Sequence, residues 1–297
     1  MPRDNETLSL LAPAKVNFSL EILGKRPDGY HELKMLMAPI SLYDEIDISP
    51  LPVNSLEVFS EGSEYVCSGE ENICHRAASF YFEETGISGG AKIEVRKNIP
   101  VGAGLGGGSS DAAATIMALE RLYGRKLSED SRKKAAFKVG ADLPFFFAKG
   151  WALVEGIGEK VTPITPDDTL WLVVAHPGVF LSTAAVFSHR TNVLTTTSLV
   201  PTIMQFNFRG VSEGVRNDLQ EAALAIEPAI GELFSAFENS GSKVTFLTGS
   251  GSAVVSLSPS RKEAERVAQN LSAVAKTGWR IEVAHTLGEV SLFFGVK

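Results

Sequence analysis

The chain has 297 residues and a formal net charge of -7, and 44% of its residues are hydrophobic. This length and apolar content suffice for one large domain or two smaller ones with a sizeable core. The negative charge argues against nucleic-acid binding through bulk electrostatics, although a small anionic substrate responds to local charge instead. No stretch approaches the roughly twenty apolar residues that cross a bilayer, and the N-terminus lacks a signal-peptide pattern. We therefore expect a cytoplasmic protein with no membrane or nucleic-acid partner.

The sequence contains two cysteines, Cys67 and Cys74, which are too few for a disulfide framework. No His or Cys pair falls at the spacing of a metal site. We expect two buried or inert thiols.

The first predicted element is a strand in which polar and apolar residues alternate from Lys15 to Ile22. A period of two indicates a half-buried strand and places Lys15 and Asn17 on the same face, about 7 Å apart. Such a pair is typical either of a solvated strand face or of a rigid element that holds an anionic group and a hydroxyl. The pattern by itself favours the solvated face.

The next segment, residues 24–31, reads Gly-Lys-Arg-Pro-Asp-Gly-Tyr-His, and its Pro-Asp-Gly indicates a tight turn. The turn brings Tyr30 and His31 to the mouth of a loop. An aromatic ring beside a hydrogen-bonding ring suits a planar base, although such a pair is more often mere packing. A second strand is predicted around residues 36–48, and a helix capped by Asn72 over residues 72–84.

The most unusual stretch lies between residues 98 and 114. Five glycines fall within seven positions and are followed at once by Ser109, Ser110, Asp111 and a run of alanines. Glycines let backbone amides approach a ligand, and either serine is a good N-cap for the alanine-rich helix. A glycine-rich loop that enters a helix N-terminus is typical of a phosphate site.

This loop differs from the two best-known phosphate loops. A Walker loop requires a lysine where Gly108 stands. The first, second and fourth glycines match the dinucleotide fingerprint, with Glu129 at a suitable distance. However, the preceding strand over residues 91–97 is half polar and Pro100 follows it, whereas a dinucleotide fold runs a buried strand straight into the loop. The remaining alternative, a flexible linker, seldom enters a capped alanine helix directly.

A second helix is predicted over residues 128–139, with Ser128 as its cap and Gly140 as its stop. Asp142 follows, a lone aspartate beside a proline and three phenylalanines. Composition leaves open whether it is a turn residue or a carboxylate held in an apolar cleft. A strand over residues 151–158 ends the first domain.

The second half of the chain predicts helices packed on one antiparallel sheet. The predicted strands cover residues 170–175, 244–247, 253–257 and 279–283; the predicted helices begin at Ser182 or Thr183, at Asn217, at Pro228 (through 239) and at 260 (through 274). Residues 190–212 read as a loop. The turn Thr248-Gly-Ser-Gly-Ser252 suits a phosphate and a tight hairpin about equally.

Three motifs, taken in order, resemble those of the GHMP small-molecule kinases. They are Pro-Ala-Lys-Val-Asn at residues 13–17, the glycine loop at residues 100–110, and Thr-Gly-Ser-Gly-Ser at residues 248–252. This ordered set spans nearly the whole chain and is far more specific than any one motif. Within these kinases, residues 24–31 and Gly-Ala-Asp-Leu-Pro at 140–144 resemble the 4-diphosphocytidyl-2-C-methyl-D-erythritol kinases of the non-mevalonate isoprenoid pathway.

The resemblance implies an α+β protein of two domains with the active site in the cleft between them. An ATP-binding domain over residues 1–160 would be similar to the second domain of ribosomal protein S5, and a substrate-binding domain over residues 161–297 would be ferredoxin-like. The implied activity is ATP-dependent phosphorylation of the 2-hydroxyl group of 4-diphosphocytidyl-2-C-methyl-D-erythritol, a cytidine diphosphate-linked polyol. ATP and Mg²⁺ would be the cofactors, and the protein would be a monomer or a weak homodimer.

The resemblance also implies the residues that bind ATP and carry out the transfer. Asp142 would be the catalytic carboxylate and Lys15 its partner. The phosphates of ATP would be wrapped by Pro100, Val101, Gly102, Ala103, Gly104, Leu105, Gly106, Gly107, Gly108, Ser109 and Ser110. Ser110 is the candidate magnesium ligand, and Gly249, Ser250 and Gly251 form a candidate second phosphate loop. An aspartate at position 111 would repel ATP unless it caps the helix or helps to hold the metal.

The implied substrate-binding residues come from both domains. Asn17 would lie near the reacting hydroxyl, and Thr183 near the substrate diphosphate. Tyr30 and Phe187 would sandwich the cytosine, while His31 would read its edge.

Three alternatives stay open at this point. Homoserine and mevalonate kinases share the three motifs but are not expected to carry the Asp-Gly-Tyr-His turn. A non-catalytic nucleotide sensor would bind ATP without turnover, although the presence of both Lys15 and Asp142 speaks against it. A nicotinamide dehydrogenase would require parallel βαβ repeats around the glycine loop.

Overall fold

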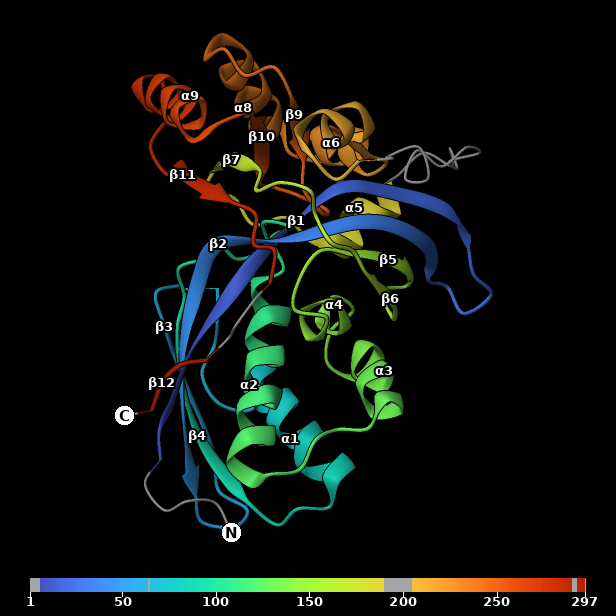
Figure 1. The fold of residues 1–297 in the computed structure, drawn as a ribbon, viewed down its shortest axis with the longest axis vertical. Coiled ribbons are helices and arrows are strands. Elements are labelled where there is room, and N and C mark those ends of the chain that lie inside the picture. The colour runs from blue at the N-terminus through green and yellow to red at the C-terminus, as the bar shows by residue number, and fades with distance from the viewer. Residues whose placement is uncertain (1–5, 64, 190–204, 290–292, 297) are drawn as a thin grey trace.

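The computed structural model describes residues 6–63, 65–189, 205–289 and 293–296. These residues form two sheets with helices packed against each, one sheet in the lower half of Figure 1 and one in the upper half. The predicted α+β class is confirmed. Among the described residues, no helix is both long and apolar enough to cross a membrane.

The first sheet has eight strands and is built on one long hairpin. This hairpin pairs β1 (Leu8–Lys25) with β2 (His31–Leu51), and its tip projects well beyond the sheet (Figure 1). The other strands are β3 (Leu56–Glu61), β4 (Gly90–Arg96), β5 (Ala152–Gly156), β6 (Lys160–Pro163), β8 (Arg216–Asn217) and β12 (Phe293–Val296). Both β8 and β12 pair with β1, so the second half of the chain also contributes to this sheet.

The strand directions rule out a dinucleotide-binding fold. β2 runs antiparallel to β1, β4 and β5, and in this sheet the described parallel pairs are β3 with β4 and β1 with β8. A dinucleotide fold would place the strand before the glycine loop in a mostly parallel sheet. The antiparallel hairpin beside β4 therefore removes the dehydrogenase alternative.

Helices of the first half cover one face of this sheet (Figure 1). They are α1 (Ile73–Thr85), α2 (Gly107–Tyr123), α3 (Glu129–Lys138) and α4 (Leu143–Phe147). The predicted caps of α1 and α3 are confirmed, because Asn72 accepts from the amide of Cys74 and Ser128 from the amide of Ser131. The central helix α2 is rich in alanine and almost wholly buried, so it approaches both α1 and the sheet closely.

The second sheet is antiparallel, as predicted, and its strand order is β11-β7-β10-β9. Its strands are β7 (Trp171–His176), β9 (Thr245–Leu247), β10 (Val254–Ser258) and β11 (Arg280–His285). The helices of this half are α5 (Thr183–His189), α6 (Phe208–Gly214), α7 (Gln220–Ile226), α8 (Pro228–Asn239) and α9 (Arg261–Ala273). Of these, α8 and α9 pack against the sheet.

Two predicted boundaries in this half are wrong. The helix expected at Asn217 begins at Gln220, because Asn217 belongs to β8 and its side-chain amide donates to the carbonyls of Leu247 and Gly249. The loop expected over residues 190–212 contains the start of α6, which Asn207 caps. Residues 190–204 of that predicted loop lie outside the described residues.

A cluster of aromatic side chains joins the two sheets. Phe18 on β1 stacks on Trp151 at a centroid distance of 5.1 Å and lies 5.9 Å from Phe246 on β9. All three side chains are at most 2% exposed. This apolar junction fixes β1 against the second sheet, and Lys15 and Asn17 lie next to it on the same strand.

Candidate active site

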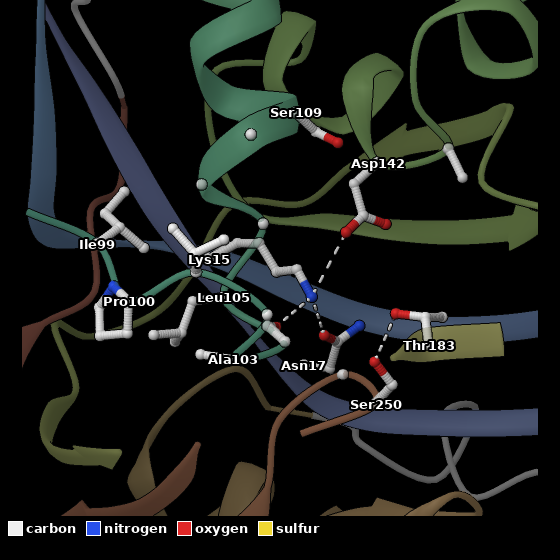
Figure 2. A pocket seen from close by; sticks show the side chains of 18 of the residues that line it. Lys15, Asn17, Ile99, Pro100, Ala103, Leu105, Ser109, Asp142, Thr183 and Ser250 are labelled. Carbon is white, nitrogen blue, oxygen red and sulfur yellow. Dashed lines mark hydrogen bonds and ion pairs between the residues drawn. The ribbon is translucent and has the colours of Figure 1, made fainter. Parts of the chain in front are cut away.

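A cavity of about 420 Å³ is lined by residues from both halves of the chain. Its lining includes β1, the glycine loop, the start of α4, α5 and the turn between β9 and β10, as Figure 2 shows. Of the predicted site residues, those in the lining are Lys15, Asn17, Asp142, Thr183, Phe187, Gly249, Ser250 and every residue from Pro100 to Ser109. Segments far apart in the sequence thus meet at one place.

The helix after the glycine loop begins earlier than predicted. Neither Ser109 nor Ser110 is its cap; α2 starts at Gly107, and its N-cap is Gly106 with φ of 71°. Glycine adopts this left-handed conformation at little cost, so the loop turns into the helix without a side-chain cap. Two consequences follow: the serines lie in the first turn, and the Ser110 hydroxyl is buried with no hydrogen-bond partner in the structure.

The glycine loop and the turn between β9 and β10 touch through their backbones. Gly104 has φ of 73°, and a Cβ on it would lie 2.1 Å from the carbonyl oxygen of Thr248. On the facing turn, a Cβ on Gly249 would lie 2.7 Å from the carbonyl oxygen of Gly104. Only glycines allow this approach. The turn is therefore a tight connection between two strands, and its Gly249 and Ser250 also line the cavity, so its phosphate-binding role stays a prediction.

Lys15 lies at the centre of the site. Its Nζ donates to Asn17 Oδ1 at 2.6 Å and to the Gly104 carbonyl at 2.7 Å, and it lies 3.5 Å from Asp142 Oδ2 (Figure 2). Burial lowers the pKa of the Lys15 ammonium, and the carboxylate of Asp142 opposes this effect. The three contacts aim the ammonium between the glycine loop and Asp142.

The expectation that β1 has a solvated face is wrong. Lys15 is 3% exposed and Asn17 is 1% exposed, although the alternation along the strand is real. The polar face is covered because the Lys15 amide donates to the carbonyl of Leu105 and the Asn17 amide donates to the hydroxyl of Thr248. These two loops come from distant parts of the chain and enclose the polar side chains within the site.

Asp142 is a carboxylate in the cleft. It occupies the N-cap position of α4, but its side chain makes no capping hydrogen bond. The side chain is 28% exposed and is directed at Lys15. Of the two readings left open by the sequence, the structure thus supports a carboxylate presented to the cavity.

The predicted substrate residues are only partly brought together. The hydroxyls of Thr183 and Ser250 lie 2.8 Å apart at the cavity wall. The ring of His31 stacks on Phe187 at 5.1 Å, with an angle of 27° between the planes. Tyr30 is 52% exposed at the hairpin tip, and neither it nor His31 is among the described residues that line the cavity.

Ser110 and Gly251 are also absent from the described lining, although each is adjacent to residues that belong to it. The two cysteines differ from one another: Cys74 is buried and Cys67 is exposed, and both are free. Burial raises the pKa of the Cys74 thiol.

Sequence reasoning missed a buried ion cluster behind the glycine loop. Lys97 Nζ donates to carboxylate oxygens of both Asp44 and Asp111. Burial raises the pKa of Asp111, an effect that the Lys97 ammonium opposes and the Asp44 carboxylate adds to. One signal was available: in the alternation of the second strand, Asp44 falls on the same face as Ile46 and Ile48, which are buried.

The described residues contain no group of three or more His, Cys, Asp or Glu side chains that would hold a metal by themselves. Mg²⁺ is commonly held by substrate phosphates together with one or two protein groups. The unpaired Ser110 hydroxyl lies in the first turn of α2, and the unpaired Asp111 Oδ1 follows at the start of the second turn. This donor set fits a phosphate-bound Mg²⁺.

Comparison with known proteins identifies the family of this chain. The GHMP kinases N terminal domain matches residues 72–150, and the GHMP kinases C terminal domain matches residues 199–277. The 4-diphosphocytidyl-2-C-methyl-D-erythritol kinase of Geobacter sp. (strain M21) is 38% identical over 94% of this chain and 99% of its own length. The enzyme of that name from Syntrophotalea carbinolica is 40% identical over 92% of this chain and 96% of its own length.

The fold of this chain is also similar to that of a solved structure. A crystal structure of 4-(cytidine 5'-diphospho)-2C-methyl-D-erythritol kinase superposes with a TM-score of 0.79 and 35% identity, covering 94% of this chain and 99% of that one. The homoserine kinase of Cytophaga hutchinsonii is 18% identical with a TM-score of 0.72, which shows the shared fold alone. The chain belongs to the GHMP kinases and, within them, to the family of the 4-diphosphocytidyl-2-C-methyl-D-erythritol kinases.

Proposed function

We propose that this protein transfers the γ-phosphoryl group of ATP to the 2-hydroxyl of 4-diphosphocytidyl-2-C-methyl-D-erythritol. The observation that carries the proposal is the Lys15–Asp142 pair, 3.5 Å apart in a cavity that the glycine loop also lines. A phosphate loop alone would support nucleotide binding. The paired ammonium and carboxylate beside it add the groups that a transfer to an alcohol requires.

On the donor side, we assign the ATP phosphates to the glycine loop, residues 100–110. The left-handed glycines leave backbone amides free of side chains, and the first turn of α2 adds the positive end of its dipole. Mg²⁺, when bound, would offset the negative charge of the phosphates, and Ser110 is the proposed protein ligand. Gly249, Ser250 and Gly251 are assigned as a second loop that faces the phosphates from the other half of the chain.

In the transfer, the acceptor oxygen forms a bond to the γ-phosphorus while the bond to the β–γ bridging oxygen breaks. A carboxylate is too weak a base to deprotonate an alcohol in the ground state. Because phosphoryl transfer usually has a loose transition state, the hydroxyl proton leaves late, and Asp142 orients the hydroxyl and then accepts that proton. Lys15 stabilises the charge on the transferring group, and Asn17 holds Lys15 in place and lies near the hydroxyl.

On the acceptor side, we assign Thr183 to the substrate diphosphate and the aromatic residues to the cytosine. The stacked rings of His31 and Phe187 lie beside the cavity, and Tyr30 is exposed at the tip of the same hairpin. In this proposal Tyr30 and Phe187 enclose the base and His31 reads its edge. Insertion of a base next to Phe187 then requires His31 to move off the ring that it covers.

The remaining parts of the proposal concern the whole protein. We propose that residues 1–160 bind ATP and residues 161–297 complete the substrate site. We further propose a cytoplasmic enzyme that acts as a monomer or weak homodimer on small molecules and binds neither nucleic acid nor membranes. The net charge of -7 supports the absence of nucleic acid.

The test is a phosphate-transfer assay with ATP, Mg²⁺ and three acceptors at equal concentration. We expect phosphorylation of 4-diphosphocytidyl-2-C-methyl-D-erythritol with kcat/KM at least about a thousandfold above homoserine and mevalonate, since a site that hydrogen-bonds a missing group rejects such analogues by orders of magnitude. Selective phosphorylation of either homoserine or mevalonate would refute the assignment.

A further inference from the structure

In the buried ion cluster of Asp44, Lys97 and Asp111, the first two residues have no assigned part in the transfer described above, and Asp111 enters it only through the oxygen that faces the metal donor set. Asp44 lies on β2, Lys97 follows the end of β4, and Asp111 lies on α2 just after its first turn. They are 0%, 6% and 3% exposed, respectively. Lys97 and Asp111 also line the cavity, so the cluster forms part of the wall on the glycine-loop side.

One oxygen of Asp44 holds the beginning of the glycine loop. Asp44 Oδ1 accepts from the backbone amide of Asn98 at 2.6 Å and from that of Ile99 at 2.8 Å. These residues directly precede Pro100, where the loop starts. A carboxylate that accepts from two successive amides fixes the backbone direction there, and loss of its bond to Ile99 would leave a buried donor unpaired.

The other oxygen of Asp44 is connected, through Lys97, to the helix that follows the loop. Asp44 Oδ2 accepts from Lys97 Nζ, which also donates to Asp111 Oδ2 at 2.6 Å. In addition, a Cβ on Gly107, the first residue of α2, would lie 3.3 Å from Asp44 Oδ2. Asp44 therefore binds the residues just before the loop directly, and it is linked to α2, just after the loop, through Lys97 and Asp111.

A purely structural role is a weak explanation for this arrangement. Burying one ammonium and two carboxylates costs desolvation that their attraction barely offsets, so buried ion clusters contribute little to stability over an apolar replacement. What the cluster does provide is a defined geometry at the two ends of a loop whose middle is anchored in the core through Ala103 and Leu105. The loop's glycines would otherwise sample many conformations.

We propose that Asp44 is a positioning residue of the donor site, which holds the glycine loop in its phosphate-binding shape before the nucleotide arrives. This inference rests on the proposed use of ATP. A loop that is already ordered loses little conformational entropy on binding, so its preorganisation contributes directly to nucleotide affinity. Loss of the clamp should therefore weaken ATP binding first and leave the chemistry of the bound complex nearly unchanged.

The test is the variant Asp44→Asn, with the affinity for a non-hydrolysable ATP analogue and Mg²⁺ measured by titration calorimetry. The amide oxygen of asparagine can still accept from the two backbone amides, but its NH₂ group opposes the Lys97 ammonium and breaks the link to α2. We expect the Kd to rise about tenfold, with kcat at saturating ATP and the KM of the acceptor within about threefold of wild type. A merely structural residue would lower the amount of folded enzyme without moving the Kd.

The matched control is Asp47→Asn. Asp47 lies on the same strand and pairs with Arg96 at 3.4 Å, so it also links β2 to the end of β4 but through a different partner. Its variant should bind the analogue as wild type does. An equal rise in Kd for both variants, or no rise for the folded Asp44 variant, would overturn the inference. Failure of the wild-type protein to bind the analogue would instead refute the proposed use of ATP.

If Asp44→Asn does not fold, hydrogen exchange on the wild-type protein provides the test. We expect the amides of Asn98 and Ile99 to exchange slowly without nucleotide and to change little when the analogue binds, since Asp44 already holds them. Rapid exchange of these two amides in the free protein, slowed only by the analogue, would contradict a clamp that exists before binding.

Discussion

For Lys15, the sequence predicts which side chain shares its strand face but not whether that face is buried. The alternation along β1 correctly places Lys15 and Asn17 on one face, and Lys15 Nζ indeed donates to Asn17. The burial of that face was not predictable from the alternation, because the covering residues, Leu105 and Thr248, lie far along the chain. A period of two reports only that the faces differ; long-range contacts decide which face is solvated.

At the residue scale, Gly104 provides a test of the contact between the two loops. Alanine at this position would be strained at φ of 73° and would place Cβ 2.1 Å from a backbone carbonyl that cannot move aside cheaply. We expect Gly104→Ala to lower the melting temperature and to raise the KM for ATP about tenfold or more.

The control for that variant is Gly288→Ala. A Cβ at Gly288 would meet no atom within 4 Å, and its φ is outside the left-handed range. It should behave as wild type. Normal ATP kinetics in Gly104→Ala would show that the two loops need not touch.

A second residue-scale prediction concerns His176, whose pKa burial lowers to about 4. Its Nδ1 accepts from the amide of Gly178, which requires the neutral ring. Because the pKa in the folded protein is below that of the unfolded chain, the stability is fully present above pH 6.5 and declines as the pH falls towards 4. We expect His176→Asn, which does not titrate, to lose about 2 kcal/mol less unfolding free energy than wild type between pH 7 and pH 4.5. Equal losses in denaturant titrations would refute this.

At the scale of elements, helix α2 shows how local propensity was overridden. Serine is a better cap than glycine, and the sequence contains two serines before the alanines. The helix nevertheless begins at Gly107, since Gly106 takes the left-handed conformation that turns the loop into the helix. For Asp142, the neighbours in sequence could not decide between a turn residue and a carboxylate in a cleft, because the answer depends on residues that are distant in sequence.

Local signals were sufficient for helix α8. It begins at Pro228 and ends at Asn239 as predicted, because packing and local signals agree there.

A substitution in the hairpin of β5 and β6 tests whether this hairpin supports the segment that carries Asp142. Gly158, in the turn of this hairpin, has φ of 125°, and a Cβ there would lie 2.4 Å from the carbonyl oxygen of Ala141. Gly158→Ala should therefore displace the segment that carries Asp142 and lower kcat about ten- to a hundredfold.

Gly124→Ala is the matched control for this prediction. Gly124 also has positive φ, at 67°, but a Cβ there would meet nothing within 4 Å. It should cost about 1 kcal/mol of stability through strain alone and leave kcat unchanged. Loss of kcat in both variants would assign the effect to general destabilisation.

At the scale of the whole molecule, the site is made by the way in which two halves of the chain meet. The order of the three motifs was sufficient to predict the family and the fold class, and the motifs supply about half of the cavity lining. The ion cluster around Asp44 and the stacking of His31 on Phe187 were not predictable, since each depends on packing between separate elements. The motifs point to the groups that we propose to react, whereas the residues that support these groups become visible only in three dimensions.

The central claim is that this cavity transfers a phosphoryl group and does not merely bind a nucleotide. The most direct measurement combines turnover and binding for Asp142→Asn, which keeps the shape of the side chain and removes its charge and basicity. The account predicts that kcat falls by about a thousandfold or more, while the dissociation constants of the ATP analogue and of 4-diphosphocytidyl-2-C-methyl-D-erythritol stay within about threefold of wild type. Near-normal turnover would remove Asp142 from the mechanism, and a wild-type protein that binds both ligands without turnover would identify a sensor instead of an enzyme.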